Sequence, residues 1–135
     1  MRLDSRKACV VAVAGVVLML AGCKEEAKPG ADEATKSAMR ETAKLAVVTR
    51  SEKGCVVIAH EGAIAVPAAP IERVADVTGA GDLFAAGFLT GLARGKDHRT
   101  AAQLGALAAA EVIQHIGARP EVSLKALAAE NGLAV

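Results

Sequence analysis

A short turn of sequence Gly-Ala-Gly-Asp at residues 79–82 divides this chain into two parts with different hydrophobic periodicity. Ahead of the turn, three short apolar segments at residues 45–49, 55–59 and 63–66 are rich in β-branched side chains, as buried strands are. After the turn, apolar residues recur at helical spacing. Strands followed by a glycine turn and then helices predict one flank of an α/β sandwich.

The first predicted helix covers residues 81–93. Phe84, Phe88 and Leu92 fall on one stripe of this helix, and Leu89 lies close to that stripe. We therefore expect a helix that is buried on more than one side.

A second helix is predicted from about residue 99 to residue 116, with Asp97 as its N-cap. Its inner face is expected to carry Leu104, Leu107, Ala108, Val112 and Ile116. Ser123 is expected to cap a last short helix that runs to Ala129.

The N-terminal 23 residues have the pattern of an export signal. Three basic residues precede an apolar run at residues 8–20, which is too short to span a bilayer and has the length of a signal-peptide core. The following sequence, Leu-Ala-Gly-Cys at residues 20–23, resembles the bacterial lipobox. That resemblance implies lipidation of Cys23 and a membrane-anchored lipoprotein. The alternative is a buried strand or helix of a soluble domain.

Residues 24–44 are rich in charge and Ala, and Pro29-Gly30 interrupts them. Residues 31–44 could form a helix from their propensities, but they offer little apolar face for packing, so a plain spacer is favoured. The expected division is therefore a signal segment at 1–23, a polar tether at 24–44 and a folded part at 45–135.

Composition argues against nucleic acid as a partner. The chain has 16 Lys and Arg against 15 Asp and Glu, and it has no Trp or Tyr that could stack on bases. Cys9, Cys23 and Cys55 are too far apart for a metal-binding pair, so Cys55 is expected to be a buried small side chain. His60, His98 and His115 have no evident catalytic partner, and His115 is expected to serve a helix end or solvent.

The turn at residues 79–82 also has the residue types needed for anion binding and proton transfer. Glycines let backbone N–H groups turn together toward an anion, and a helix N-terminus adds partial positive charge. Asp82 stands in the first turn of the same helix, where a carboxylate could accept a hydroxyl proton during phosphoryl transfer. The simpler interpretation is an acidic residue that caps an ordinary helix.

The longer string from Asp76 to Phe88, DVTGAGDLFAAGF, closely resembles the second signature of the PfkB family of kinases, which includes ribokinase, fructokinase and adenosine kinase. Residues 47–54 resemble the strand and turn that contact ATP in that family. Residues 108–120 resemble the helix and loop beside its adenine pocket. The resemblance implies a C-terminal fragment of a ribokinase-like α/β fold.

The resemblance also assigns roles to residues. It implies Asp82 as the catalytic base, the N–H groups of Gly79, Ala80 and Gly81 as an anion hole, and nucleotide contacts from Thr49 and Gly54. A monovalent cation such as K⁺ would be bound by Asp76 and the carbonyls of Thr78 and Gly117.

ATP and Mg²⁺ are the implied cofactors, and a sugar or nucleoside is the implied substrate, with an adenosine-like nucleoside favoured. The part that resembles the family is about a third of a full domain, and no N-x-x-E motif precedes the strands. We therefore expect weak activity or none from the chain alone, and exposed sheet edges with an uncovered apolar face.

Three accounts remain open at this point. The chain could be a lipoprotein start joined to a kinase tail near Lys44, a lipid-anchored non-catalytic protein that carries a kinase-derived fragment, or a kinase that needs a partner chain to complete its sheet. The kinase interpretation alone would predict a cytoplasmic protein, because the reaction needs ATP.

Overall fold

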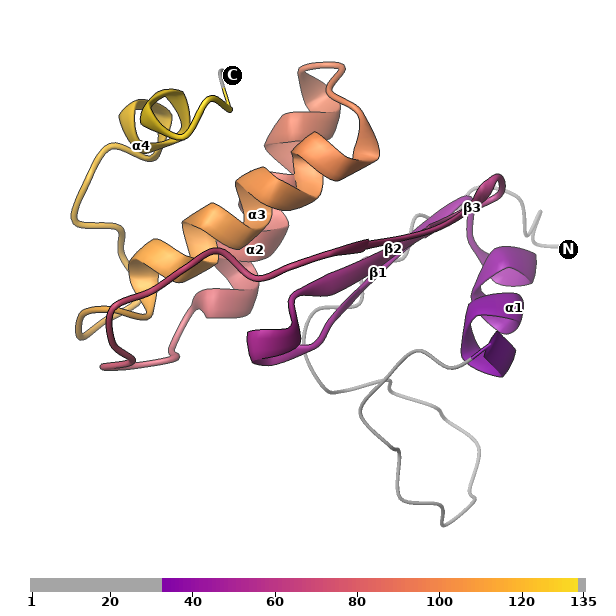
Figure 1. Cartoon of the computed structure of the whole chain (residues 1–135), viewed down its shortest axis with the longest axis horizontal. Coiled ribbons are helices and arrows are strands. Elements are labelled where there is room, and N and C mark those ends of the chain that lie inside the picture. Colours follow the sequence, from indigo (N-terminus) through magenta and orange to yellow (C-terminus); the bar gives the residue numbers. More distant parts are fainter. Residues whose placement is uncertain (1–32, 134–135) are drawn as a thin grey trace, which may run out of the picture.

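The computed structural model describes residues 33–133, in which three strands lie between one helix and a pair of packed helices (Figure 1). The α-helices and strands in chain order are α1 (Glu33–Thr42), β1 (Leu45–Thr49), β2 (Cys55–Ala59), β3 (Gly62–Val66), α2 (Ala80–Ala93), α3 (His98–Val112) and α4 (Leu124–Glu130), with a 3-10 turn at Ser51–Lys53. The predicted signal segment and Cys23 lie outside the described residues. Among the helices of residues 33–133, none has the length and apolar character needed to cross a membrane.

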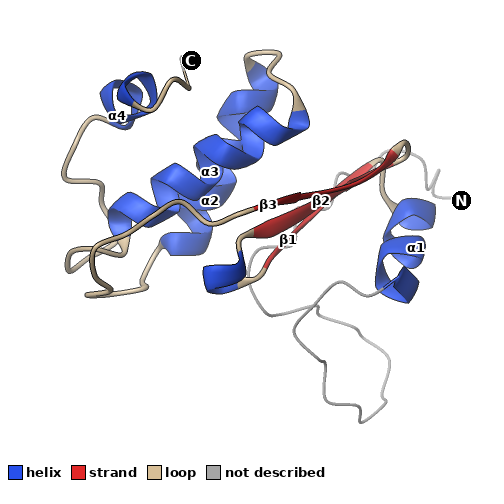
Figure 2. Ribbon diagram, in the orientation of Figure 1, coloured by secondary structure: helices blue, strands red, loops and turns tan. Residues whose placement is uncertain are grey.

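The strands form an antiparallel sheet in the order β1-β2-β3 (Figure 2). Thr49 at the end of β1 lies opposite Cys55, and Cys55 lies opposite Val66 at the end of β3. This register brings the turn between β1 and β2 beside the start of the long loop that leads to α2. The three predicted strands are confirmed, with β3 beginning one residue earlier than expected.

Both faces of the central strand are covered. On one face, Val57 packs in a core that includes Phe84 and Phe88 of α2. On the other, Val56 and Ile58 belong to a smaller cluster against which Met39 of the α1 segment packs.

The prediction of a plain spacer before the sheet is therefore wrong for the segment that forms α1. Met39 and Ala43 supply enough apolar surface to dock the helix on the sheet. An ion pair between Glu33 and Lys36, 2.6 Å apart, joins neighbouring turns of α1. Helix α1 thereby covers part of the apolar sheet face that was expected to be uncovered.

Close contact between α2 and α3 depends on glycines in both helices. A Cβ on Gly105 would lie 2.6 Å from the carbonyl oxygen of Phe84, and a Cβ on Gly87 would lie 2.7 Å from that of Leu104. The stripe of Phe84 and Phe88 is confirmed, and their rings stack with centroids 6.3 Å apart. Leu89 is 46% exposed, so α2 is less buried around its circumference than predicted.

Helix α3 ends earlier than the sequence predicts. It stops at Val112, and Ile116, which was expected on the inner face, is 86% exposed. The physical reason is a competing set of hydrogen bonds, because the carbonyl of Ile113 accepts the N–H groups of Ala75 at 2.8 Å and Asp76 at 3.3 Å. The chain is thereby drawn out of the helix toward the loop before α2.

The predicted helix starts are confirmed by their caps. Asp97 accepts the N–H of Thr100 at the start of α3, and Ser123 accepts the N–H of Ala126 at the start of α4. Asn131 caps the end of α4.

Candidate phosphate-binding site

The glycine turn forms the N-terminus of α2, as predicted. Gly79 is the N-cap residue with φ of 81°, a backbone conformation that favours glycine. A Cβ there would also lie 2.6 Å from the Cβ of Ala118. Glycine is thus required twice at this position, by its backbone angle and by the close approach of the loop after α3.

The three amides expected to form an anion hole are not equivalent. The Ala80 N–H donates to the carbonyl of Val77 at 3.2 Å, so it is already engaged. No acceptor within residues 33–133 takes the N–H of Gly79 or Gly81. These two N–H groups stand at the positive end of the α2 dipole and remain available to an anion.

Asp82 is the third residue of α2, and its side chain is exposed. Its carboxylate accepts no hydrogen bond from the described part of the chain. The structure therefore leaves this carboxylate free, within one helical turn of the free amides of Gly79 and Gly81.

Asp76 organises the loop that precedes the turn. One carboxylate oxygen accepts the N–H of Thr78 at 2.9 Å and its hydroxyl at 2.7 Å. The other accepts the N–H of Gly117 at 3.1 Å. The hydroxyl of Thr78, followed by its N–H and that of Gly117, lowers the pKa of Asp76 and keeps it ionised.

The three residues expected to bind a cation are thus brought together, in a different arrangement from the one predicted. Gly117 presents its N–H to Asp76, whereas the prediction used its carbonyl. Three of the roughly four acceptor positions of the carboxylate are occupied by protein donors. The carbonyls of Thr78 and Gly117 accept no backbone hydrogen bond from the described residues, so they could still serve a cation.

Thr49 and Gly54 lie at the turn between β1 and β2. Gly54 has φ of 77°, and a Cβ there would lie 2.1 Å from the carbonyl oxygen of Val66. The turn is also closed by Arg50, whose guanidinium donates to the carbonyl of Lys53 at 3.0 Å and whose Nε is buried without a partner. The turn is therefore packed against the end of β3.

A cavity of about 870 Å³ opens between α3, α4 and the loop after β3. Its apolar wall includes Pro67, Ala106, Ala110 and Leu127, and its polar lining includes Arg73, Gln103, Glu111, Gln114 and His115. The volume is of the order that small-molecule sites occupy.

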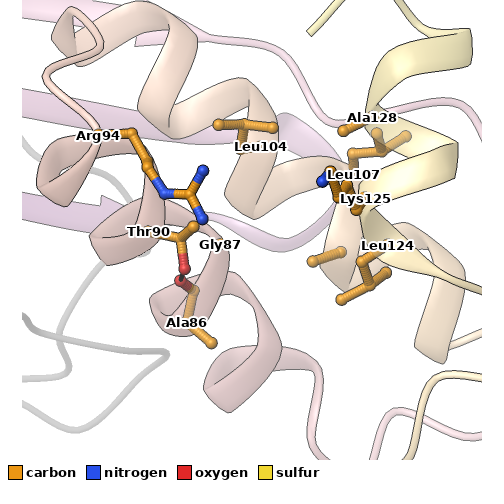
Figure 3. Close-up of a pocket in the computed structure, with 10 residues that line it drawn as sticks. Ala86, Gly87, Thr90, Arg94, Leu104, Leu107, Leu124, Lys125 and Ala128 are labelled. Atoms are coloured by element: carbon orange, nitrogen blue, oxygen red, sulfur yellow. Dashed lines mark hydrogen bonds between the residues drawn. The ribbon is translucent and has the colours of Figure 1, made fainter. Parts of the chain in front are cut away.

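A second, smaller cavity of about 190 Å³ lies between α2, α3 and α4 (Figure 3). Leu104, Leu107 and Leu124 contribute to its apolar lining, and Arg94 and Lys125 stand at it. Asp82 does not line this cavity, so it is separate from the helix N-terminus described above.

His115 and Glu111 of the larger cavity are more buried than the sequence indicates. The side chain of His115 is only 12% exposed, and its Nε2 lies 3.2 Å from a carboxylate oxygen of Glu111. The expectation that His115 faces solvent is therefore wrong, although it does lie just beyond the end of α3. Glu111 itself was not singled out, because an acidic residue in an Ala-rich helix gives no sequence signal of burial.

Side-chain metal clusters and the thiol of Cys55 are two further candidates for chemistry in the described residues. No group of three or more His, Cys, Asp or Glu side chains there could hold a metal ion. Cys55 is a free thiol that is 1% exposed, as predicted, and burial raises its pKa to about 11.

Comparison with protein families gives one clear similarity. A family described as pfkB family carbohydrate kinase matches residues 18–125. The cytidine kinase of Thermococcus kodakarensis is 45% identical over 78 residues, which are 56% of this chain and 27% of that protein. The adenosine kinase of Saccharomyces cerevisiae is 36% identical over 76 residues, or 55% of this chain and 22% of that protein.

Solved structures give the same result. A probable sugar kinase from Rhizobium etli superposes with a TM-score of 0.73 at 44% identity, over 75% of this chain and 31% of that one. The adenosine kinase of Sinorhizobium meliloti superposes with a TM-score of 0.71 at 43% identity, over 73% and 30%. The chain thus spans less than a third of the length of each of these four proteins.

Proposed function

Because this chain belongs to the pfkB family of carbohydrate kinases, we propose that it carries the phosphate-binding and catalytic end of an ATP-dependent phosphotransferase. The acceptor is a hydroxyl group of a sugar or nucleoside. The relatives that match this chain include kinases of both kinds.

One observation carries the proposal. The first turn of α2 combines two free N–H groups, on Gly79 and Gly81, with the free carboxylate of Asp82. Phosphoryl transfer to an alcohol needs donors for the charge on the moving group and a base for the attacking oxygen. This turn supplies both within four residues.

Each residue then has a defined task. Asp82 accepts the proton of the attacking hydroxyl, and the amides of Gly79 and Gly81 stabilise negative charge on the transferred phosphoryl group. Ala80 contributes mainly to the turn itself, since its N–H is bonded to Val77. Asp76 and Gly117 hold the loop in place so that these donors are preorganised.

The nucleotide base fits the larger cavity. Its apolar wall between Pro67 and Ala110 suits a planar ring, and its polar residues can meet the edges of that ring. Thr49 and Gly54 would contact the nucleotide from the turn between β1 and β2. The tight packing of Gly54 against Val66 supports a rigid turn there.

The described residues offer ligands for a monovalent cation but not for Mg²⁺. The open carbonyls of Thr78 and Gly117, with the remaining acceptor position of Asp76, suit K⁺ or a similar monovalent ion. Residues 33–133 hold no acidic cluster for Mg²⁺. We therefore assign Mg²⁺ to the phosphates of the incoming ATP, whose charge it neutralises.

Within this proposal we favour a nucleoside acceptor, from the likeness to the cytidine and adenosine kinases, although sugar kinases match at similar identity. Activity would need more protein than residues 33–133, given the share of each relative that the chain spans. We propose a partner chain that supplies the rest of the domain and extends the sheet at one of the two outer strands of the described residues, β1 or β3.

The test is nucleotide binding and phosphotransfer by the full chain. Calorimetric titration with ATP should give saturable binding, and radiolabelled ATP with a panel of nucleosides and sugars should give a labelled product once the completing chain is present. Asp82→Asn should keep the binding and reduce turnover by about 10²- to 10⁴-fold. Absent binding, or unchanged turnover in Asp82→Asn, refutes the proposal.

A second candidate function rests on the lipobox-like sequence at residues 20–23. In this alternative the chain is a non-catalytic protein anchored to a membrane through a lipid on Cys23, and the cytoplasmic location expected of a kinase would be wrong. Mass spectrometry of the protein from a bacterial membrane fraction should show a diacylglyceryl group on Cys23. Cys23→Ser should release the protein, and an unmodified Cys23 excludes this function.

A further inference from the structure

Glu111 is a buried acid in the interior of an otherwise largely apolar helix face. The residue is 9% exposed, and it is the single charged residue among the buried positions of the described chain. One carboxylate oxygen accepts the backbone N–H of Glu121 at 2.9 Å and lies 3.2 Å from His115 Nε2. The second oxygen is buried without a partner.

Such a group is costly in this place. A buried carboxylate loses its hydration, and here only one of its oxygens is compensated by hydrogen bonds. A side chain such as Leu would fill the same volume without that cost. The presence of Glu111 is therefore best explained by what its two contacts hold in place.

Those contacts fasten a loop that reaches the proposed phosphate site. The loop of residues 113–121 leaves α3 beside His115 and is tied back to α3 at Glu121. Between these two points, Gly117 donates its N–H to Asp76 at 3.1 Å. Ala118, the next residue, lies against the Cα of Gly79 at the start of α2.

A second set of bonds runs alongside. The N–H of Glu72 donates to the side chain of Gln114 at 3.0 Å, and Arg73 donates to the backbone carbonyl of Gln114 at 3.1 Å. These hydrogen bonds join the loop before α2 to the loop after α3, so that a shift of one loop displaces the other.

We propose that Glu111 is a positioning residue for the phosphate site. It acts through residues 113–121, which set the positions of Asp76 and Gly79. The effect of Glu111 on the loop does not depend on the proposed function. Only its effect on nucleotide binding rests on that function. Glu111 lies outside the glycine turn; it lines the larger cavity, where one of its carboxylate oxygens is engaged by Glu121 and His115.

The test compares Glu111→Leu with Glu111→Gln. Leu keeps the volume and removes the acceptor, whereas Gln keeps an oxygen that can accept the Glu121 N–H. Amide hydrogen exchange measured by NMR reports the Gly117 N–H directly. We expect Gly117 to exchange at least about tenfold faster in Glu111→Leu and within about threefold of wild type in Glu111→Gln.

Glu130→Leu is the matched control, since Glu130 is an exposed acid on α4 whose side chain forms no hydrogen bond or ion pair within residues 33–133. It should leave Gly117 exchange unchanged. If Glu111→Leu does not fold, His115→Leu removes one of the two contacts of the same oxygen, and Gly117 exchange should then rise at least about threefold. Unchanged Gly117 exchange in a folded Glu111→Leu, or in His115→Leu, overturns the proposal.

Nucleotide affinity is a second readout, and Gly117 exchange measured without nucleotide separates the positioning role from a direct contact in the larger cavity. If wild type binds ATP, Glu111→Leu should weaken binding by about tenfold, and Glu111→Gln should restore it to within about threefold. If wild type does not bind ATP, the proposed function fails, and Gly117 exchange still decides whether Glu111 positions the loop.

Discussion

A carboxylate oxygen of Asp76 accepts the N–H of Gly117 at 3.1 Å, across 41 positions of sequence. This bond joins the loop that enters α2 to the loop that leaves α3. It is reinforced by the two N–H groups that the Ile113 carbonyl accepts and by the contact of Gly79 with Ala118. The free amides at the start of α2 are thus held from a distant part of the chain.

Gly54→Ala should destabilise the chain severely. The new Cβ would lie 2.1 Å from the carbonyl oxygen of Val66, and φ of 77° disfavours any residue with a Cβ. We expect a loss of about 2 to 4 kcal/mol in the free energy of unfolding, measured by urea denaturation. Ala63→Gly, at an exposed position of β3, should cost about 1 kcal/mol or less. Equal losses in the two variants would contradict this account of the turn.

Gly105→Ala should destabilise the contact between α2 and α3. A Cβ there would meet the carbonyl oxygen of Phe84 at 2.6 Å and its ring at 3.1 Å. The overpacking cost of about 1 to 3 kcal/mol exceeds or cancels the gain of up to about 1 kcal/mol from replacing Gly in a helix. Thermal melting should therefore show no stabilisation, with Ala93→Ser on the exposed side of α2 as a mild reference. A clear rise in Tm would refute the close contact.

Cys55 should resist thiol reagents in the folded chain. Burial raises its pKa to about 11 from an ordinary 9.0, so at pH 8 the thiol is protonated and also inaccessible. Labelling by iodoacetamide, located on the Cys55 peptide by mass spectrometry, should be at least about a hundredfold slower than in urea. Fast labelling under native conditions would show that β2 opens readily.

The same shift predicts a loss of stability in alkali. The unfolded thiol ionises from pH 9.0 upward, while the folded thiol stays protonated until about pH 11. The stabilising contribution is complete below pH 9.0 and declines as the pH rises toward 11. Cys55→Ala removes this group, so its urea midpoint should fall less steeply over that range. Parallel declines would argue against the raised pKa.

Asp97→Asn should make the chain less sensitive to acid. The hydroxyl of Thr100, followed by its N–H, lowers the pKa of Asp97 below its ordinary 3.8. The contribution of the ionised cap is present above pH 3.8 and is lost as the pH falls through the lowered value. Asn can cap the helix without ionising. Between about pH 5 and about pH 3 the Tm of wild type should therefore fall further than that of Asp97→Asn, whereas identical profiles would exclude a role for the ionised cap.

The local elements of this fold could be predicted from the amino-acid sequence, because their causes are local. Alternating and continuous apolar runs specify β1, β2 and β3, and Asp97 and Ser123 specify the starts of α3 and α4 through their own hydrogen bonds. The glycines at positions 79 and 81 predict the turn before α2, because glycine has the backbone freedom that such a turn needs. Family membership was equally readable, since its signature is a contiguous string.

Which groups meet in space depends on the packing of the whole fold. The early end of α3, the docking of α1 through Met39 and the burial of Glu111 all depend on partners far away in sequence. The same holds for the N–H that Gly117 offers to Asp76, where the sequence suggested a carbonyl. Hydrogen bonds between loops are set by packing in three dimensions, and no periodicity in the chain encodes them.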